Sequence, residues 1–172
     1  MAAPDLAPEA PAESRRFWLL RQDIDLKKGL WSYTPPKTKS KTGVQHIVPL
    51  STQVIHLLSE LARITKAKSE YVFSATTSNL KPMSENTINQ ALRRLGYTSE
   101  EACGHGFRAS ARTILEEVLE YPVEWIEQQL AHKVRDMHGT AYNRTKHLDK
   151  RTQMMQSWAD YCDDIKKMAN SL

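Results

Sequence analysis

A histidine and an arginine lie three residues apart in the segment Gly104-His105-Gly106-Phe107-Arg108, where a helix is expected to begin. That spacing puts His105 and Arg108 on one face of the helix, beside the backbone N–H groups that its first turn leaves unpaired. Such a site favours an anion, most naturally a phosphate. The alternative is structural, with His105 capping the helix and Arg108 solvated.

A second histidine and a tyrosine follow downstream. His132 ends a segment that is expected to be helical from Pro122, and Tyr142 comes ten residues later, after Gly139. A histidine in the last turn of a helix is favourable with the helix dipole, and a lone tyrosine usually belongs to a core or a surface. Singly these residues are weak evidence. Together with Arg108 they supply a cation, a proton carrier and a phenol nucleophile, the groups that phosphoryl transfer needs.

Other chemistry has less support in the sequence. None of the histidines has the paired spacing of a metal site such as H-E-x-x-H, and Cys103 and Cys162 are isolated. A Gly-rich phosphate loop and a G-x-S-x-G segment are also missing from the sequence. We therefore expect no metal and no cofactor, and two thiols that are buried or idle. The histidines are His46, His56, His105, His132, His138 and His147.

The elements that must position these residues are mostly helices. Leu30–Tyr33 and Val44–Val48 are β-rich and flank a polar stretch with several lysines, which predicts a β-hairpin with a basic tip. Everything after Leu50 has the apolar spacing or the caps of helices. The sequence thus predicts a mainly helical α+β domain with one small antiparallel sheet. The expected helices start near Ser51 or Thr52, Ser84, Phe107, Pro122 and Leu148.

The amino-acid composition is that of a single globular domain. The chain has 172 residues, a net charge of +4, 26% charged and 40% hydrophobic residues, which is ordinary for one globular domain. No apolar run near its start is long enough to span a membrane or to act as a secretory signal. We expect a soluble, cytoplasmic protein. Residues 1–14 are Ala/Pro/Glu-rich and predict a flexible tail, and 15–172 predict the folded domain.

The candidate residues lie in short sequence segments that follow one another in a fixed order along the chain. In this order the segments resemble those of the catalytic domain of the tyrosine recombinases, also called phage integrases, and especially the prophage integrases of satellite phages and genomic islands. Similar sequence is also found at 23–26, 71–73, 81–87 and 158–161, so the resemblance covers most of the chain. The main boxes are Lys41 before His46-Ile47-Val48-Pro49-Leu50-Ser51, His105-Gly106-Phe107-Arg108, Leu130-Ala131-His132 and Ala141-Tyr142-Asn143-Arg144.

The resemblance implies a role for each candidate in site-specific DNA integration. Tyr142 would attack a DNA phosphate and form a 3′-phosphotyrosine. Arg108 and His132 would hold that phosphate, because its transition state carries extra negative charge. Lys41 would protonate the leaving 5′-oxygen, and His105 would act as a base or positioning group toward Tyr142.

The resemblance also implies partners. The lysine is assigned to Lys41 by its distance from the following strand, with Lys39 as the alternative. Lys37, Lys39 and Arg144 are expected to contact DNA phosphates. Double-stranded DNA attachment sites are the expected partner, in a bacterial or phage-encoded protein. The C-terminal helix is expected either to dock on a neighbouring protomer or to pack on its own core.

One box departs from the family pattern. The first catalytic arginine belongs in an R-x-x-E box eleven residues before Asp23, where this chain has Ala12 and, in place of the acid, Arg15. The separate N-terminal domain is not found either. We therefore expect impaired strand cleavage. Two alternatives are a remnant that only binds DNA or assembles, and a helix-turn-helix regulator around Ser84 and Gly96, which leaves the order of the boxes unexplained.

Overall fold

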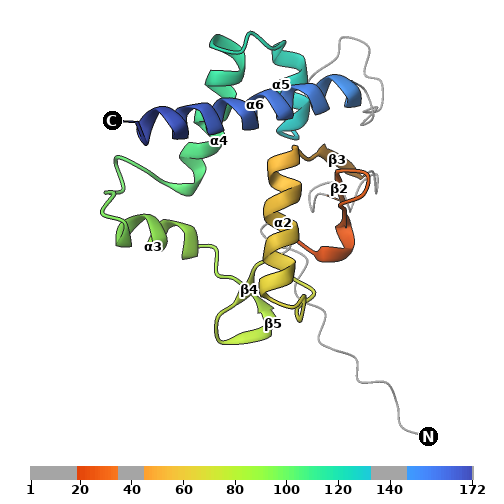
Figure 1. Ribbon diagram of the computed structural model, residues 1–172, viewed down its shortest axis with the longest axis vertical. Helices are drawn as coiled ribbons and strands as arrows, with labels where there is room; N and C mark the ends of the chain where they lie inside the picture. The colour runs from red at the N-terminus through yellow and green to blue at the C-terminus, as the bar shows by residue number, and fades with distance from the viewer. Residues whose placement is uncertain (1–18, 35–44, 133–146, 172) are drawn as a thin grey trace, which may run out of the picture.

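The computed structural model describes residues 19–34, 45–132 and 147–171, and two small sheets accompany its helices (Figure 1). The predicted α+β, mainly helical class is confirmed. The elements, in chain order, are η2 (Arg21–Asp23), β1 (Ile24–Asp25), β2 (Leu30–Tyr33), β3 (His46–Pro49), α2 (Thr52–Ile64), β4 (Ser74–Ala75), β5 (Ser78–Pro82), α3 (Thr87–Arg94), α4 (Gly104–Glu117), α5 (Val123–Gln129) and α6 (Leu148–Ala169).

The predicted hairpin strands pair as expected. β1, β2 and β3 form an antiparallel sheet in that order, with Trp31 opposite Val48 and Tyr33 opposite His46. Aromatic side chains stabilise it, because Trp31 and Tyr33 stack with ring centroids 4.3 Å apart and the His46 ring meets Tyr33 edge-on. The residues on either side of positions 35–44 are therefore held next to each other in the sheet.

A second sheet was not expected, because everything after Leu50 was assigned to helices. β4 and β5 pair as a two-stranded antiparallel sheet. Its strands lack the apolar alternation that identifies a half-buried strand, and Leu80 in β5 is 87% exposed. The backbone is instead held by contacts such as Ser69 Oγ donating to the Asn79 carbonyl at 2.5 Å.

The helix starts agree with the sequence in part. α2 begins after Ser51, whose Oγ accepts from the Val54 N–H at 3.4 Å, as its predicted capping role requires. α3 begins at Thr87 and not at Ser84, and it ends before Gly96, whose φ of +95° suits glycine after a helix end. α4 begins at Gly104, earlier than the predicted Phe107.

Loss of the α2 cap gives a testable change in stability. We expect Ser51→Ala to lower the free energy of unfolding by about 1 kcal/mol, because the Val54 N–H loses its acceptor. Ser59→Ala is the matched control, since the Ser59 hydroxyl only donates to the Ile55 carbonyl inside the same helix, and it should change stability by less than about 0.5 kcal/mol. Urea unfolding measures both, and equal effects would contradict the capping role.

α4, α5 and α6 share a core. Leu115, Ile126 and Met154 are 2%, 0% and 0% exposed and contact one another, and Trp158 packs against them. The first half of α6 therefore packs on its own domain, which was one of the two expectations for this helix. Toward its end Ile165 is exposed. Docking of α6 on another protomer stays a prediction for that exposed end.

β3 is tied to the end of α5 and to α6. Arg151 in α6 is fully buried and donates through Nη1 to the Ile47 carbonyl at 2.9 Å and to Gln129 Oε1 at 3.1 Å. Burial lowers the pKa of its guanidinium. The buried His46 ring places Nε2 3.2 Å from the Gln129 carbonyl oxygen. These contacts fix the base of the hairpin relative to the end of α5.

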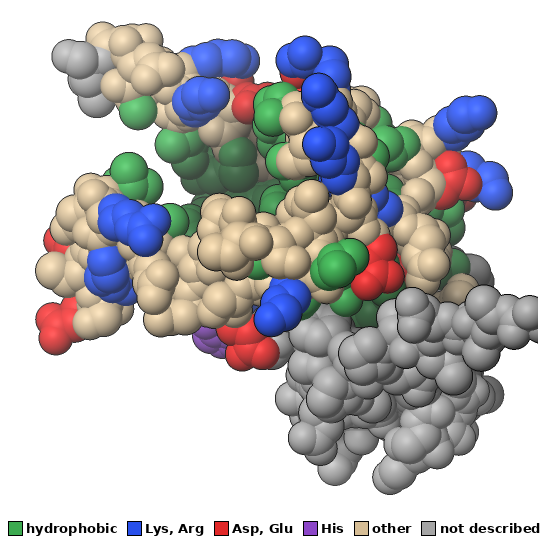
Figure 2. Space-filling view, turned by 90° about the horizontal axis from the view of Figure 1, so that it is seen from below, with side chains coloured by type: hydrophobic (Ala, Val, Ile, Leu, Met, Phe, Trp, Pro, Cys, Tyr) green, Lys and Arg blue, Asp and Glu red, His purple; other side chains and the backbone are tan. Residues whose placement is uncertain are grey.

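One side of the molecule shows much apolar surface. Figure 2 shows a hollow with hydrophobic side chains on its walls. Large exposed apolar side chains occur on α2 and α4 and just after α3. Among them are Leu57, Phe107 and Leu95, which are 65%, 60% and 74% exposed. These helices thus present apolar side chains outward as well as toward the core.

Candidate functional site

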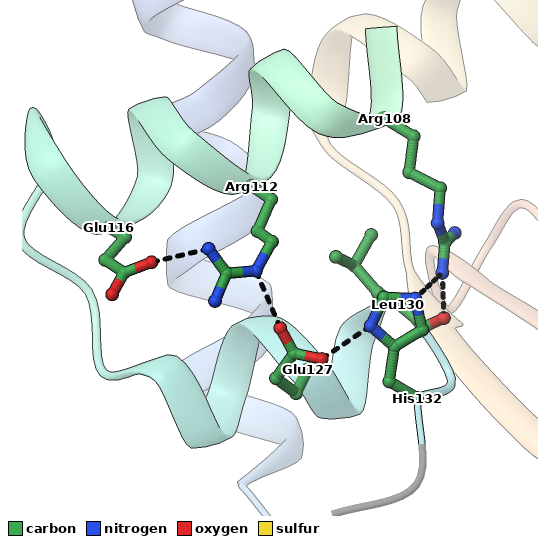
Figure 3. Close-up of polar contacts among 6 residues, drawn as sticks. All are labelled: Arg108, Arg112, Glu116, Glu127, Leu130 and His132. Carbon is green, nitrogen blue, oxygen red and sulfur yellow. Dashed lines mark hydrogen bonds and ion pairs between the residues drawn. The ribbon is translucent and has the colours of Figure 1, made fainter. Parts of the chain in front are cut away.

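Arg108 and His132 meet although they are 24 residues apart in sequence. Arg108 extends from α4, and its Nη2 lies 3.1 Å from His132 Nε2, just beyond α5 (Figure 3). The same Nη2 donates to the Leu130 carbonyl. Both side chains are exposed, so a ligand can reach them. A planar guanidinium beside an imidazole is suited to hold the oxygens of one phosphate.

A backbone motif at the end of α5 places His132. The Ala131 N–H donates to the Gln128 carbonyl at 3.1 Å, and the His132 N–H donates to the Glu127 carbonyl at 2.9 Å. With Ala131 left-handed at φ +55°, this is a Schellman ending, which turns the chain back over the last helical turn. His132 therefore sits beside Glu127, and its ring faces α4.

Three charged residues continue the contacts behind His132. His132 Nδ1 lies 2.5 Å from Glu127 Oε2, Arg112 Nε donates to Glu127 Oε1 at 2.8 Å, and Arg112 also pairs with Glu116 at 2.7 Å (Figure 3). Burial would raise the pKa of Glu127, but hydrogen bonds from His132 and Arg112 outweigh it and lower that pKa. The hydrogen bond to Glu127, with the charge of Glu116, raises the pKa of Arg112.

The start of α4 differs from the expected anion site. The Gly104 N–H donates to Asn89 Oδ1 at 2.8 Å, and the Gly106 N–H lies 3.3 Å from Cys103 Sγ. Two of the N–H groups expected to face a phosphate therefore have partners within the chain. The prediction of a buried or idle thiol is therefore wrong for Cys103, which is half-buried and caps α4. His105 is exposed in the first turn, and no hydrogen bond joins it to Arg108 or His132 within the described residues.

The structure thus brings together two of the predicted catalytic residues, Arg108 and His132, and sets His105 on the same helix as Arg108. The remaining candidates lie outside the described residues. These are Lys37, Lys39, Lys41, Tyr142 and Arg144.

Sequence reasoning missed the residues behind His132. The spacing of Arg112 and Glu116 is visible as an i,i+4 pair, but such pairs are common on solvated helix faces. Glu127 comes five residues before His132, which is not a helical contact spacing. Only the Schellman ending brings these two side chains together.

The described residues contain neither a metal-binding cluster nor a membrane-spanning helix. No group of three or more His, Cys, Asp or Glu side chains in that part of the chain is arranged to hold a metal ion. None of its helices combines the length and apolar character needed to cross a membrane.

Comparison with known proteins decides the family. The profile of the Phage integrase family matches residues 17–149. The chain belongs to the phage integrase family. It is 44% identical over 154 residues to the integrase of Enterobacteria phage P4, covering 82% of this chain and 35% of that protein.

Other integrases in the family show a similar likeness. The integrase of Shigella phage Sf6 and the prophage integrase IntS of Escherichia coli K12 are each 44% identical over 119 residues, which is 69% of this chain and 30% of each relative. The chain therefore spans about a third of the length of the curated relatives it matches. No solved structure matches it. The predicted resemblance to the tyrosine recombinases, or phage integrases, is confirmed.

Proposed function

We propose that this chain supplies active-site residues of a tyrosine recombinase that acts in site-specific DNA recombination. The contact between Arg108 and His132 supports this most strongly, because two helices bring a cationic fork and an imidazole within 3.1 Å at an exposed position. Together they can hold the non-bridging oxygens of one phosphate as negative charge develops. Family membership favours the same chemistry.

In the proposed reaction the Tyr142 oxygen attacks the phosphorus of a DNA phosphodiester. A phosphotyrosine bond to the 3′ end forms while the bond to the 5′-oxygen breaks. The phenol proton passes to His105 or to water, and Lys41 protonates the departing 5′-oxygen. Because the phosphotyrosine keeps the energy of the phosphodiester, a 5′-hydroxyl can later attack it and rejoin a strand.

Binding of the DNA duplex is proposed to rest on phosphate contacts. Lys37 and Lys39, in the stretch that joins β2 to β3, and Arg144, next to the nucleophile, are the residues assigned to it. Each contact of this kind releases counterions, so binding should weaken steeply with salt.

A second candidate function is DNA binding or assembly without chemistry. It is favoured by the first arginine box, where Ala12 and Arg15 stand in place of an arginine and an acid. Loss of one cationic donor to a transition state costs about 10²–10³ in rate. Under the first candidate, we propose that this loss leaves domain 15–172 cleaving DNA slowly. Under the second candidate, it leaves only binding or assembly.

Trapping on a nicked suicide substrate tests the proposal. The duplex carries a candidate attachment sequence, and a nick beside the cleavage site lets the short fragment with the freed 5′-hydroxyl diffuse away. We expect a slowly formed protein–DNA complex that survives denaturation in detergent. Salt-sensitive binding without such a complex would favour the second candidate. Absence of both would contradict the proposed function.

A further inference from the structure

We propose that Glu127 is a positioning residue that sets the proton arrangement of His132 for the phosphate held with Arg108. This inference rests on the proposed function of that pair. Glu127 holds His132 at two points, since its carbonyl accepts the His132 N–H at 2.9 Å and its Oε2 lies 2.5 Å from His132 Nδ1. One residue therefore fixes both the backbone and the ring of the histidine.

Glu127 is itself held in place. Arg112 Nε donates to Glu127 Oε1 at 2.8 Å, and Nη1 of the same guanidinium donates to Glu116 Oε2 at 2.7 Å. The Glu127 side chain is 21% exposed, and its two partners keep it ionised at neutral pH. An ionised carboxylate only accepts hydrogen bonds. In the hydrogen bond between His132 and Glu127, Nδ1 of His132 must then be the donor and carry the proton.

The geometry assigns a role to the other ring nitrogen. In the neutral ring with a proton on Nδ1, Nε2 has a lone pair, and this lone pair accepts from Arg108 Nη2 at 3.1 Å. To donate to a phosphate oxygen, Nε2 must take up a proton. Glu127 Oε2 stays the acceptor of the Nδ1 proton in that state, and Arg108 turns to the phosphate. Among the described residues, Arg108 from α4 and Glu127 from α5 are the charged groups in contact with the ring.

The tautomer of His132 in the DNA-free chain tests the contact without any cleavage assay. Long-range ¹H–¹⁵N spectra report which ring nitrogen carries the proton, and His132→Gln assigns the signal. We expect the Nδ1–H form in the wild type and in Glu116→Gln, which also alters the Arg112 contacts but does not touch His132. Glu127→Gln should populate the Nε2–H form. A wild type with the Nε2–H form, or a Glu127→Gln spectrum like that of wild type, would overturn the proposal.

Cleavage of the suicide substrate supplies the second readout. We expect Glu127→Gln to slow formation of the covalent complex by about 10- to 100-fold with DNA affinity unchanged, as for other groups that orient a functional histidine. Glu127→Asp should restore part of the rate, because it keeps the carboxylate. Equal rates in Glu127→Gln and Glu116→Gln would overturn the positioning role. If the wild type forms no complex, the proposed function fails, and the tautomer measurement alone decides the contact. The same measurement on Glu127→Asp decides it if Glu127→Gln does not fold.

Discussion

Replacing Tyr142 with phenylalanine is expected to abolish the covalent protein–DNA complex. The change removes only the phenolic oxygen, which is the atom that would bond to phosphorus in the proposed step. DNA binding should stay close to that of wild type, because phosphate contacts by lysine and arginine supply most of the affinity. Suicide-substrate trapping and a binding titration, made side by side, measure the two effects.

Tyr97→Phe is the control for this change. Tyr97 is 51% exposed after α3, so the same atom is removed from a tyrosine on the surface. The control should trap DNA as the wild type does. A covalent complex that persists in Tyr142→Phe would show that another residue is the nucleophile.

Replacing Arg108 with alanine should slow formation of the covalent complex by about 10²–10³-fold, the usual loss when one donor to a transition-state charge is removed. Arg108→Lys should fall between alanine and the wild type, since lysine keeps the charge but loses the planar fork. The contacts with Leu130 and His132 end with either change. Single-turnover rates at saturating chain concentration separate this loss from weaker binding.

Arg63→Ala controls for the general loss of one positive charge. Arg63 is exposed on α2 and pairs only with Glu60 among its described contacts, so its removal should leave the rate within a few-fold of wild type. Urea unfolding checks that Arg108→Ala folds. A folded Arg108→Ala that cleaves as fast as Arg63→Ala would remove Arg108 from the catalytic centre.

Long periodic segments and strong caps could be predicted from the sequence. α2 starts at its predicted cap Ser51, α6 matches its apolar spacing, and the strands of the first hairpin pair. The short strands β4 and β5 could not be predicted, because they bury little and their pairing rests on backbone contacts. α4 begins earlier than predicted, since glycine at 104 and 106 weakens the helical pattern that the sequence presents.

Only those parts of the candidate site could be predicted whose residue types and order in the sequence match the motifs of the family. Arg108 and His132 stand in recognisable boxes, and the structure brings them into contact. Glu127 could not be found, because its contact with His132 depends on a left-handed residue at Ala131, and such a backbone turn at alanine has no sequence signal of its own. The same turn explains how a histidine outside the helix can be fixed by that helix.

The described strands on either side of residues 35–44 are both tied to the rest of the fold. Arg151, His46 and Gln129 hold the strand after that stretch, and the pairing of β2 with β3 holds the strand before it. The anchor of β3 and the turn that places His132 therefore share the end of α5, so a substitution that loosens β3 is expected to shift the turn at His132 as well.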